Sequence, residues 1–332
     1  MKLSVRILLS VLYAAMVLAM PFVLSAPKIL GVVRMEMEDM IPGEDEGWLR
    51  RLLPTACAEE IQVETETAYA LPVDFTPGYA PDEALFTEGG YEDDSIRVQM
   101  ETREEDGVIW RIAWVEVASP TQLRTGIAGA KVTATSAKKL VPTMAKEYNA
   151  VVAMNGDWYT KDPQKTTFEY QMGQKIRNKT NRKKDILIID ENGDFHTFIK
   201  SQGVLDFEKD TGHQIVNDFT FGPALVQEGQ VLKMDKEYGY NPNGQEPRSA
   251  IGQLDRLSYV LVIAEGRGES AGVTHQQLAD FMGALGCLEA FNLDGGGTAV
   301  MVFHGQVVNN LGGSPREQSD IIYFATAVSP EE

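Results

Sequence analysis

The stretch EAFNLDGGGTAVM at residues 289–301 decides how this chain is interpreted. Its apolar lead-in predicts a strand, a carboxylate and three glycines follow, and a β-branched run predicts a second strand. Three consecutive glycines indicate a backbone with positive φ or one that another group approaches closely, since glycine loses the most freedom on folding. Such a loop can bind an anion through successive N–H groups, and Asp294 can accept a proton. The alternative is a tight hairpin with an Asx-turn.

Five segments of the chain resemble, in order, the motifs of the phosphodiester glycosidase family. Residues 292–298, NLDGGGT, are similar to that family's NLDGGGS signature, with Thr298 in place of serine. The other segments are MNGDWY at 154–159, FGPAL at 221–225, PRSAIG at 247–252, and EGR at 265–267 followed by SAGVT at 270–274. The resemblance spans roughly residues 96–328. It implies hydrolysis of a sugar whose anomeric carbon is joined to a phosphodiester.

The resemblance also implies which residues carry the chemistry. Asp294 is expected to act as base or nucleophile, and Arg248 and Arg267 are expected to hold the phosphate, because a guanidinium can bind phosphate through two parallel hydrogen bonds. The N–H groups of the glycine loop would assist them. Substrate binding is assigned to Asn155, Asp157, Asn292, Gly295, Gly296, Gly297, Thr298 and Arg316. Phosphate is a weakly basic leaving group, so we expect charge stabilisation to matter more than proton donation.

Residues 175–184 hold six basic side chains in a chain whose formal net charge is −18. This segment either steers a phosphate-bearing substrate toward the site or forms a solvated loop. It shows neither aromatic interleaving nor a nucleic-acid-binding motif, so nucleic acid is not expected as a partner. The expected partner is a phosphate-bearing glycan or glycopolymer.

Hairpin signals dominate the sequence between Ile96 and Val328, and long helical patterns are few. Alternating runs flank Asp106-Gly107, for example, and Thr274 begins a capping box ahead of an apolar stripe that ends at Gly286. Helical spacing over 137–148 predicts a second helix, and Pro142 limits how far that helix extends upstream. We therefore predict an α+β fold, a strand-rich mixed or antiparallel sheet with a few packed helices.

The N-terminal part has a different character. Residues 7–26 are about twenty uncharged residues, enough for a helix across a hydrocarbon core of about 30 Å, and a cleaved signal peptide is the rival interpretation. Residues 35–95 carry 17 acidic and 2 basic side chains, which favours an extended tether. The predicted organisation is an anchor at 1–26, an acidic linker at 27–95 and a glycosidase domain at 96–328. A single-pass protein with an extracytoplasmic domain is expected.

The metal-ligating residue types give no clear signal. Cys57 and Cys287 do not form a disulfide framework, and the four histidines show no metal-ligand spacing. No cofactor is expected; carboxylate-bound Ca²⁺ stays open, and no metal ligands are assigned. Two other functions remain alternatives: a non-catalytic envelope module that binds anionic exopolysaccharide, and a metal-dependent phosphoesterase.

Overall fold

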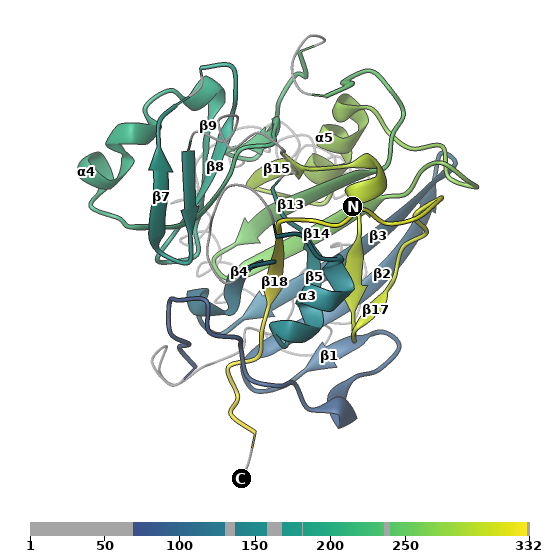
Figure 1. Ribbon diagram of the computed structural model, residues 1–332. Helices are drawn as coiled ribbons and strands as arrows, with labels where there is room; N and C mark the ends of the chain where they lie inside the picture. The colour runs from purple at the N-terminus through teal and green to yellow at the C-terminus, as the bar shows by residue number, and fades with distance from the viewer. Residues whose placement is uncertain (1–68, 130–136, 158–167, 181, 236–239, 331–332) are drawn as a thin grey trace, which may run out of the picture. The chain divides into compact units, whose positions relative to one another are not determined.

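The computed structural model describes residues 69–129, 137–157, 168–180, 182–235 and 240–330. Its largest sheet has eight strands in the order β1-β2-β3-β14-β13-β15-β11-β12, and neighbouring strands run antiparallel (Figure 1). The strands are β1 (Gly90–Glu92), β2 (Ile96–Glu105), β3 (Val108–Val117), β11 (Ala224–Gln227), β12 (Gln230–Val231), β13 (Arg248–Asp255), β14 (Ser258–Ala264) and β15 (Glu289–Leu293).

A five-stranded antiparallel sheet has the order β17-β16-β5-β18-β4. Its strands are β4 (Leu123–Ile127), β5 (Val152–Asn155), β16 (Met301–Phe303), β17 (Gln306–Val307) and β18 (Asp320–Phe324). Two smaller sheets have the orders β10-β8-β9 and β6-β7. They comprise β6 (Phe168–Gln171), β7 (Gln174–Asn178), β8 (Ile186–Asp190), β9 (Phe195–Phe198) and β10 (Ile215–Phe219).

The helices among the described residues are few and short. Their α-helices are α3 (Val141–Glu147), α4 (Phe207–Thr211) and α5 (His275–Ala284). Single 3₁₀ turns are η2 (Glu83–Leu85), η3 (Pro120–Gln122), η4 (Ile199–Ser201), η5 (Val204–Asp206) and η6 (Gly296–Thr298). Strand-rich sheets with a few packed helices confirm the predicted α+β class.

The main hydrophobic core lies between the two large sheets. It joins Ile263 of β14 and Phe291 of β15 to Met154 of β5 and Ile322 of β18. Strand β8 extends this core, because alternate residues of β8 belong to it and to a separate core under α4. Burial of these apolar faces is the main stabilising term of the fold.

The outer face of each large sheet is covered by a helix. Helix α5 packs on the eight-stranded sheet, where the ring of Phe281 stacks on Trp110 with centroids 3.6 Å apart. It begins at the predicted capping box, in which the Thr274 hydroxyl accepts from the N–H of Gln277. Helix α3 packs through Met144 against β18 of the five-stranded sheet. The sheets thus form two inner layers between two helices.

Helix α3 occupies the C-terminal part of the segment 137–148 that has helical spacing. It begins at Val141 with Pro142 in its first turn, in agreement with the limit that the proline sets in the sequence. Upstream, Lys139 exchanges two backbone hydrogen bonds with Gln318, of 3.0 and 2.7 Å. Because proline has no N–H and is favoured in the first turn, the helix starts there and the preceding residues form a bridge.

Ordered structure extends upstream of Ile96, where the sequence predicted the folded part to start. Strand β1 pairs with β2, and the ring of Tyr91 is buried in the main core. The buried guanidinium of Arg124 donates to the carbonyls of residues 72, 74 and 76 at 3.0, 2.8 and 2.9 Å. These contacts fix the segment from about residue 71 onward on the domain, because each carbonyl needs a donor once buried.

The remainder of the predicted linker and the predicted anchor at 7–26 lie outside the described residues. In the part of the chain that the structure describes, no helix is long and apolar enough to cross a membrane.

Replacing Arg124 with methionine should unfold the domain at lower denaturant. Five acceptors, including Thr121 O at 2.8 Å and the Tyr323 hydroxyl at 3.1 Å, would lose their charged donor, which should cost about 3 kcal/mol or more. Urea unfolding followed by tryptophan fluorescence measures this. Arg103→Met is the matched control, since Arg103 makes a partly exposed ion pair with Glu101 and a cation–π contact with Phe281, each worth ~1 kcal/mol or less. Equal losses in the two variants would contradict the anchoring role of Arg124.

Candidate active site

The glycine loop carries the chain from one large sheet to the other. Strand β15 belongs to the eight-stranded sheet and β16 to the five-stranded sheet, with the 3₁₀ turn η6 between them. The alternative of a tight hairpin is therefore wrong. Gly296 has φ +65°, and a Cβ on Gly295 would lie 2.6 Å from the carbonyl oxygen of Pro247. Both positions require glycine, as the sequence indicated.

The backbone of Asp294 is held from three sides. Its N–H donates to the carbonyl of Asp157 at 3.2 Å. Its own carbonyl accepts from Asn155 Nδ2 at 2.8 Å and from the Ser249 hydroxyl at 3.1 Å. Because Asn155 ends β5 and Ser249 lies in β13, these bonds fix Asp294 relative to both large sheets. The half-buried Asp294 is placed on rigid supports and lines a cavity.

Asn155 and Asp157 have their polar groups engaged within the protein. The Asn155 amide oxygen accepts from Ser249 Oγ at 2.9 Å. The Asp157 carboxylate accepts from the N–H groups of Thr220 and Phe221 and from the Thr220 hydroxyl, each at 2.7 Å. Burial raises the pKa of Asp157, and these hydrogen bonds oppose the rise. Both residues are placed to position Asp294 and the loop after β10, and neither lines the cavity.

Asn292 and Thr298 are also buried and turned toward the protein. Asn292 Nδ2 donates to the carbonyl of Gly222 at 2.7 Å, which joins the family's NLDGGG and FGPAL segments. The Thr298 hydroxyl donates to the carbonyl of Gly295 and so closes the glycine loop on itself. These contacts make both side chains supports of the loop. Their predicted contact with substrate stays a prediction.

A cavity of about 520 Å³ opens beside Asp294. Segments distant in sequence meet there. They are the start of β13, the residues that follow β14 and β15, and the residues that precede β8 and β18. Five lining residues are basic and two are acidic. The lining consists of Lys183, Lys184, Phe221, Tyr240, Glu246, Pro247, Arg248, Arg267, Asp294, Gly295, Gly296 and Arg316.

Arg248 lines the cavity, but most of its N–H donors are hydrogen-bonded to backbone carbonyls of the protein. Its side chain is buried and donates to the carbonyls of Val273 at 2.8 Å, Asn241 at 2.7 Å and Gly244 at 3.0 Å. Burial lowers the pKa of Arg248 to about 10. This geometry makes Arg248 a brace for the segment at 241–247, which forms part of the cavity wall.

Arg267 and Arg316 are exposed arginines whose side chains lie close to the glycine loop. Arg267 Nη2 pairs with Glu246 Oε2 at 2.8 Å, and a Cβ on Gly296 would lie 3.1 Å from that nitrogen. The backbone N–H of Arg316 donates to the carbonyl of Gly297 at 3.0 Å. The glycines therefore leave room for two guanidinium groups beside Asp294.

The anion-binding prediction for the loop N–H groups needs one correction. The N–H of Gly296 donates to the carbonyl of Pro247 at 2.7 Å, so this group is already engaged. The bond forms because the loop turns back over the start of β13. Basic side chains, rather than this N–H, are what the cavity offers to an anion.

Lys183 and Lys184 line the cavity, although the sequence did not assign them individually to the site. They belong to the basic run at 175–184, which is the signal that pointed to them. Lys184 Nζ donates to the carbonyl of Phe221 at 3.3 Å. Burial lowers the pKa of Lys184, and the nearby carboxylates Asp157 and Asp294 oppose that shift. Trp158 and Tyr159, which the sequence suggested as an aromatic wall, lie outside the described residues.

A buried carboxyl group lies directly behind the first site motif. A Cβ on Gly156 would lie 2.5 Å from Asp320 Oδ1, and Gln171 Nε2 donates to Asp320 Oδ2 at 3.2 Å. Burial raises the pKa of Asp320 to about 8, and the charges of Asp157 and Glu169 add to the rise. A neutral carboxyl group is therefore favoured in the folded protein.

The comparisons with known proteins support the family resemblance. The family model of phosphodiester glycosidases matches residues 148–325, which is more than half of the chain, so the chain belongs to this family. The SPbeta prophage-derived protein YomE of Bacillus subtilis strain 168 is 32% identical over 96 residues, covering 29% of this chain and 15% of YomE. The mouse and human N-acetylglucosamine-1-phosphodiester alpha-N-acetylglucosaminidases are 25% and 27% identical over 114 residues.

These matches span a small part of the relatives. The alignments cover 30% of this chain and 22% of each mammalian enzyme. A solved structure of the zebrafish N-acetylglucosamine-1-phosphodiester alpha-N-acetylglucosaminidase catalytic domain, auto-inhibited by its pro-peptide, has a TM-score of 0.55 at 18% identity. That likeness covers 75% of this chain and 86% of the zebrafish chain, and it shows a shared fold.

Asp320→Asn should change how stability depends on pH. Since the folded pKa of about 8 exceeds the unfolded value of ~3.9, the wild type should lose stability as pH rises from ~4 to ~8. The asparagine variant lacks this titration, so its melting temperature should rise relative to that of the wild type as the pH increases from ~4 to ~8. Exposed Asp94, changed to asparagine, is the control and should follow the wild-type profile. Parallel profiles for Asp320→Asn and wild type would contradict the raised pKa.

Proposed function

We propose that this chain hydrolyses glycosyl phosphodiesters and releases the sugar from a phosphate-bearing glycan or glycoconjugate of the cell envelope. One observation carries the proposal: five basic side chains and Asp294 line one cavity in a chain of net charge −18. Such a concentration of positive charge favours a polyanionic ligand. Membership of the phosphodiester glycosidase family supports the reaction class.

The phosphate would lie among the exposed cations of the cavity. Arg267 and Arg316 lie close to the glycine loop, and Lys184 lies near enough to Asp294 for their charges to interact. Arginine can hold two phosphate oxygens at once, and lysine adds a point charge. The Glu246–Arg267 ion pair orients one of these guanidinium groups. Arg248 contributes positive charge from the cavity wall while bracing it.

Asp294 would act on the anomeric side of the scissile bond. Its carboxylate follows directly after the end of β15, and its backbone is fixed by bonds to both large sheets. As nucleophile it would attack the anomeric carbon directly; as base it would take a proton from the attacking water. The bond from the anomeric carbon to phosphate oxygen breaks in both cases. Water supplies hydroxyl to the sugar and a proton to the phosphomonoester.

The cellular setting is part of the proposal. An uncleaved N-terminal helix at residues 7–26 would anchor the chain as a single-pass membrane protein, with the catalytic domain on the extracytoplasmic side. The acidic residues between the anchor and the domain would act as a self-repelling spacer. Envelope glycopolymers that contain phosphodiesters would then be within reach.

Asp294→Asn should abolish sugar release from a GlcNAc-1-phosphodiester, lowering kcat roughly 10³-fold or more, because the amide can serve neither as base nor as nucleophile. Release of free sugar by the full chain measures this, with simple glycosides as parallel substrates. Asp94→Asn is the control and should keep wild-type turnover. Full activity in Asp294→Asn would remove Asp294 from the mechanism. Substrate binding without turnover in the wild type would favour the non-catalytic, exopolysaccharide-binding alternative.

Lys184→Gln should lower kcat/KM for the phosphodiester about 10- to 100-fold, because one charge-assisted contact is worth ~1.5–3 kcal/mol. Steady-state kinetics at several ionic strengths measures this, and the loss should shrink at high salt. Lys146→Gln removes an exposed charge from the end of α3 and serves as the matched control. Equal kinetics for Lys184→Gln and Lys146→Gln would exclude a phosphate-binding role for Lys184.

A further inference from the structure

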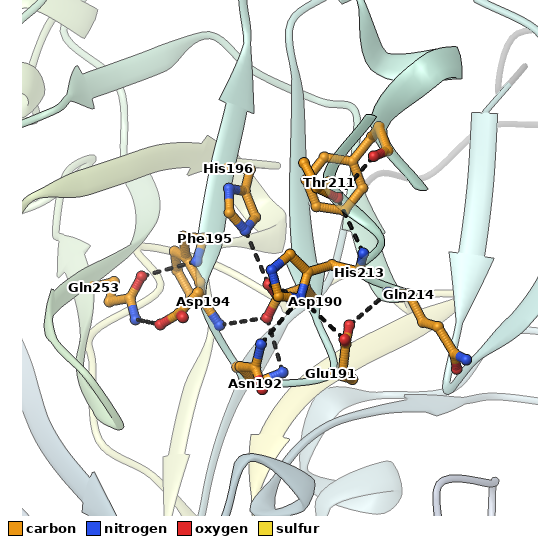
Figure 2. Close-up of polar contacts among 12 residues, drawn as sticks. Asp190, Glu191, Asn192, Asp194, Phe195, His196, Thr211, His213, Gln214 and Gln253 are labelled. Carbon is orange, nitrogen blue, oxygen red and sulfur yellow. Dashed lines mark hydrogen bonds and ion pairs between the residues drawn. The ribbon is translucent and has the colours of Figure 1, made fainter. Parts of the chain in front are cut away.

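A second group of polar side chains gathers at the β8–β9 turn, outside the cavity beside Asp294. Asp190 ends β8, Glu191 follows in the turn, and His213 lies just ahead of β10 (Figure 2). Because β8 pairs with both β9 and β10, the sheet brings these distant residues to one place. The ligand-type atoms of the three side chains all lie within 4.8 Å of one another.

Backbone N–H groups fix one oxygen of each carboxylate. Asp190 Oδ1 accepts from the N–H groups of Asn192 at 2.8 Å and Asp194 at 3.0 Å. Glu191 Oε2 accepts from the N–H of Gln214 at 2.5 Å. The second oxygen of each carboxylate is thereby turned toward the imidazole of His213, as Figure 2 shows. The turn presents two oriented, single-oxygen ligands.

The distances around His213 suit a small divalent metal ion. His213 Nδ1 lies 3.0 Å from Glu191 Oε1 and 3.8 Å from Asp190 Oδ2. Ligands about 2.0–2.1 Å from a tetrahedral Zn²⁺ lie roughly 3.3–3.4 Å from one another. The three ligand atoms all lie within 4.8 Å of one another, so binding of an ion would draw them together from positions that are already close. One imidazole nitrogen and two carboxylate oxygens are ligand types that Zn²⁺ commonly takes.

A second histidine, His196, contacts the carboxylate of Asp190. His196 Nε2 lies 3.1 Å from Asp190 Oδ2, the oxygen that faces His213. A carboxylate oxygen can accept a hydrogen bond from one imidazole while it binds a metal, and such bonds orient metal ligands. The side chain of Asp190 is 1% exposed and His213 is 41% exposed, so solvent reaches one side of the group. A water molecule from that side would complete the coordination as fourth ligand.

His213 Nδ1 carries at most one hydrogen, which cannot form hydrogen bonds with all the polar atoms around it. This atom faces two carboxylate oxygens and also Asn192 Nδ2, 3.2 Å away. A ring hydrogen given to Glu191 does not reach Asp190 Oδ2, 3.8 Å away, and that oxygen then has His196 as its imidazole partner. A metal ion, in contrast, accepts lone pairs from the nitrogen and from both oxygens together.

We propose that Asp190, Glu191 and His213 form a binding site for a divalent transition-metal ion of the Zn²⁺ class, with His196 orienting Asp190. The ion would link the β8–β9 turn to the segment that leads into β10. None of the three ligands lines the cavity beside Asp294, so the site would be structural. It is independent of the proposed glycosidase activity.

Zinc titration of the tag-free full chain tests the site. After removal of metal by chelator, Zn²⁺ is added at pH 8, where imidazole is neutral and binds metal, in competition with a chromophoric zinc chelator. We expect one ion per chain with micromolar affinity or tighter. His213→Gln and Glu191→Gln each remove one ligand from an exposed position and should weaken binding more than about 100-fold.

His304→Gln is the matched control. His304 is an exposed histidine that pairs with the carboxylate of Glu83 at 2.7 Å, and this pair does not belong to the three-ligand group. Its replacement should leave zinc affinity unchanged. Circular dichroism shows whether each variant is folded at the titration temperature. Absence of stoichiometric zinc binding to the folded wild type would overturn the proposal, as would equal affinities in wild type and folded His213→Gln.

Discussion

The hydrogen bonds that fix the backbone of Asp294 are the constraint on which the rest of the site depends. Asn155 and Ser249 hold its carbonyl at 2.8 and 3.1 Å, and Asp157 accepts its N–H at 3.2 Å. These partners come from both large sheets, so the sheet packing sets the position of the carboxylate. Because misplacement by about 1 Å can cost 10²-fold in rate, such supports matter as much as groups that contact substrate.

The same geometry separates two kinds of polar residue around the glycine loop. Asn155, Asp157 and Asn292 use their polar atoms within the protein and determine where the loop lies. Arg267 and Arg316 are exposed and lie close to the loop, where a ligand can meet them. A half-buried, positioned carboxylate beside solvent-facing cations divides the chemistry between the sugar side and the phosphate side.

Local signals explain what the sequence predicted well. The hairpin around Asp106 and the capping box at Thr274 depend on residues close in sequence. The structure confirms both predictions. The glycine loop was found because its composition is unusual. Side-chain roles were harder: Arg248 donates to carbonyls at 241, 244 and 273, and Arg124 reaches back about fifty residues. Such partners depend on tertiary structure, so no sequence pattern marks them.

The measurement that tests the central claim most directly is a crystal structure of the full chain with a non-hydrolysable glycosyl phosphonate. We expect the phosphonate oxygens to contact Arg267, Arg316 or Lys184, with the anomeric carbon beside the Asp294 carboxylate, because the cavity places these groups together. A phosphonate bound outside this cavity, or an anomeric carbon directed away from Asp294, would contradict the account.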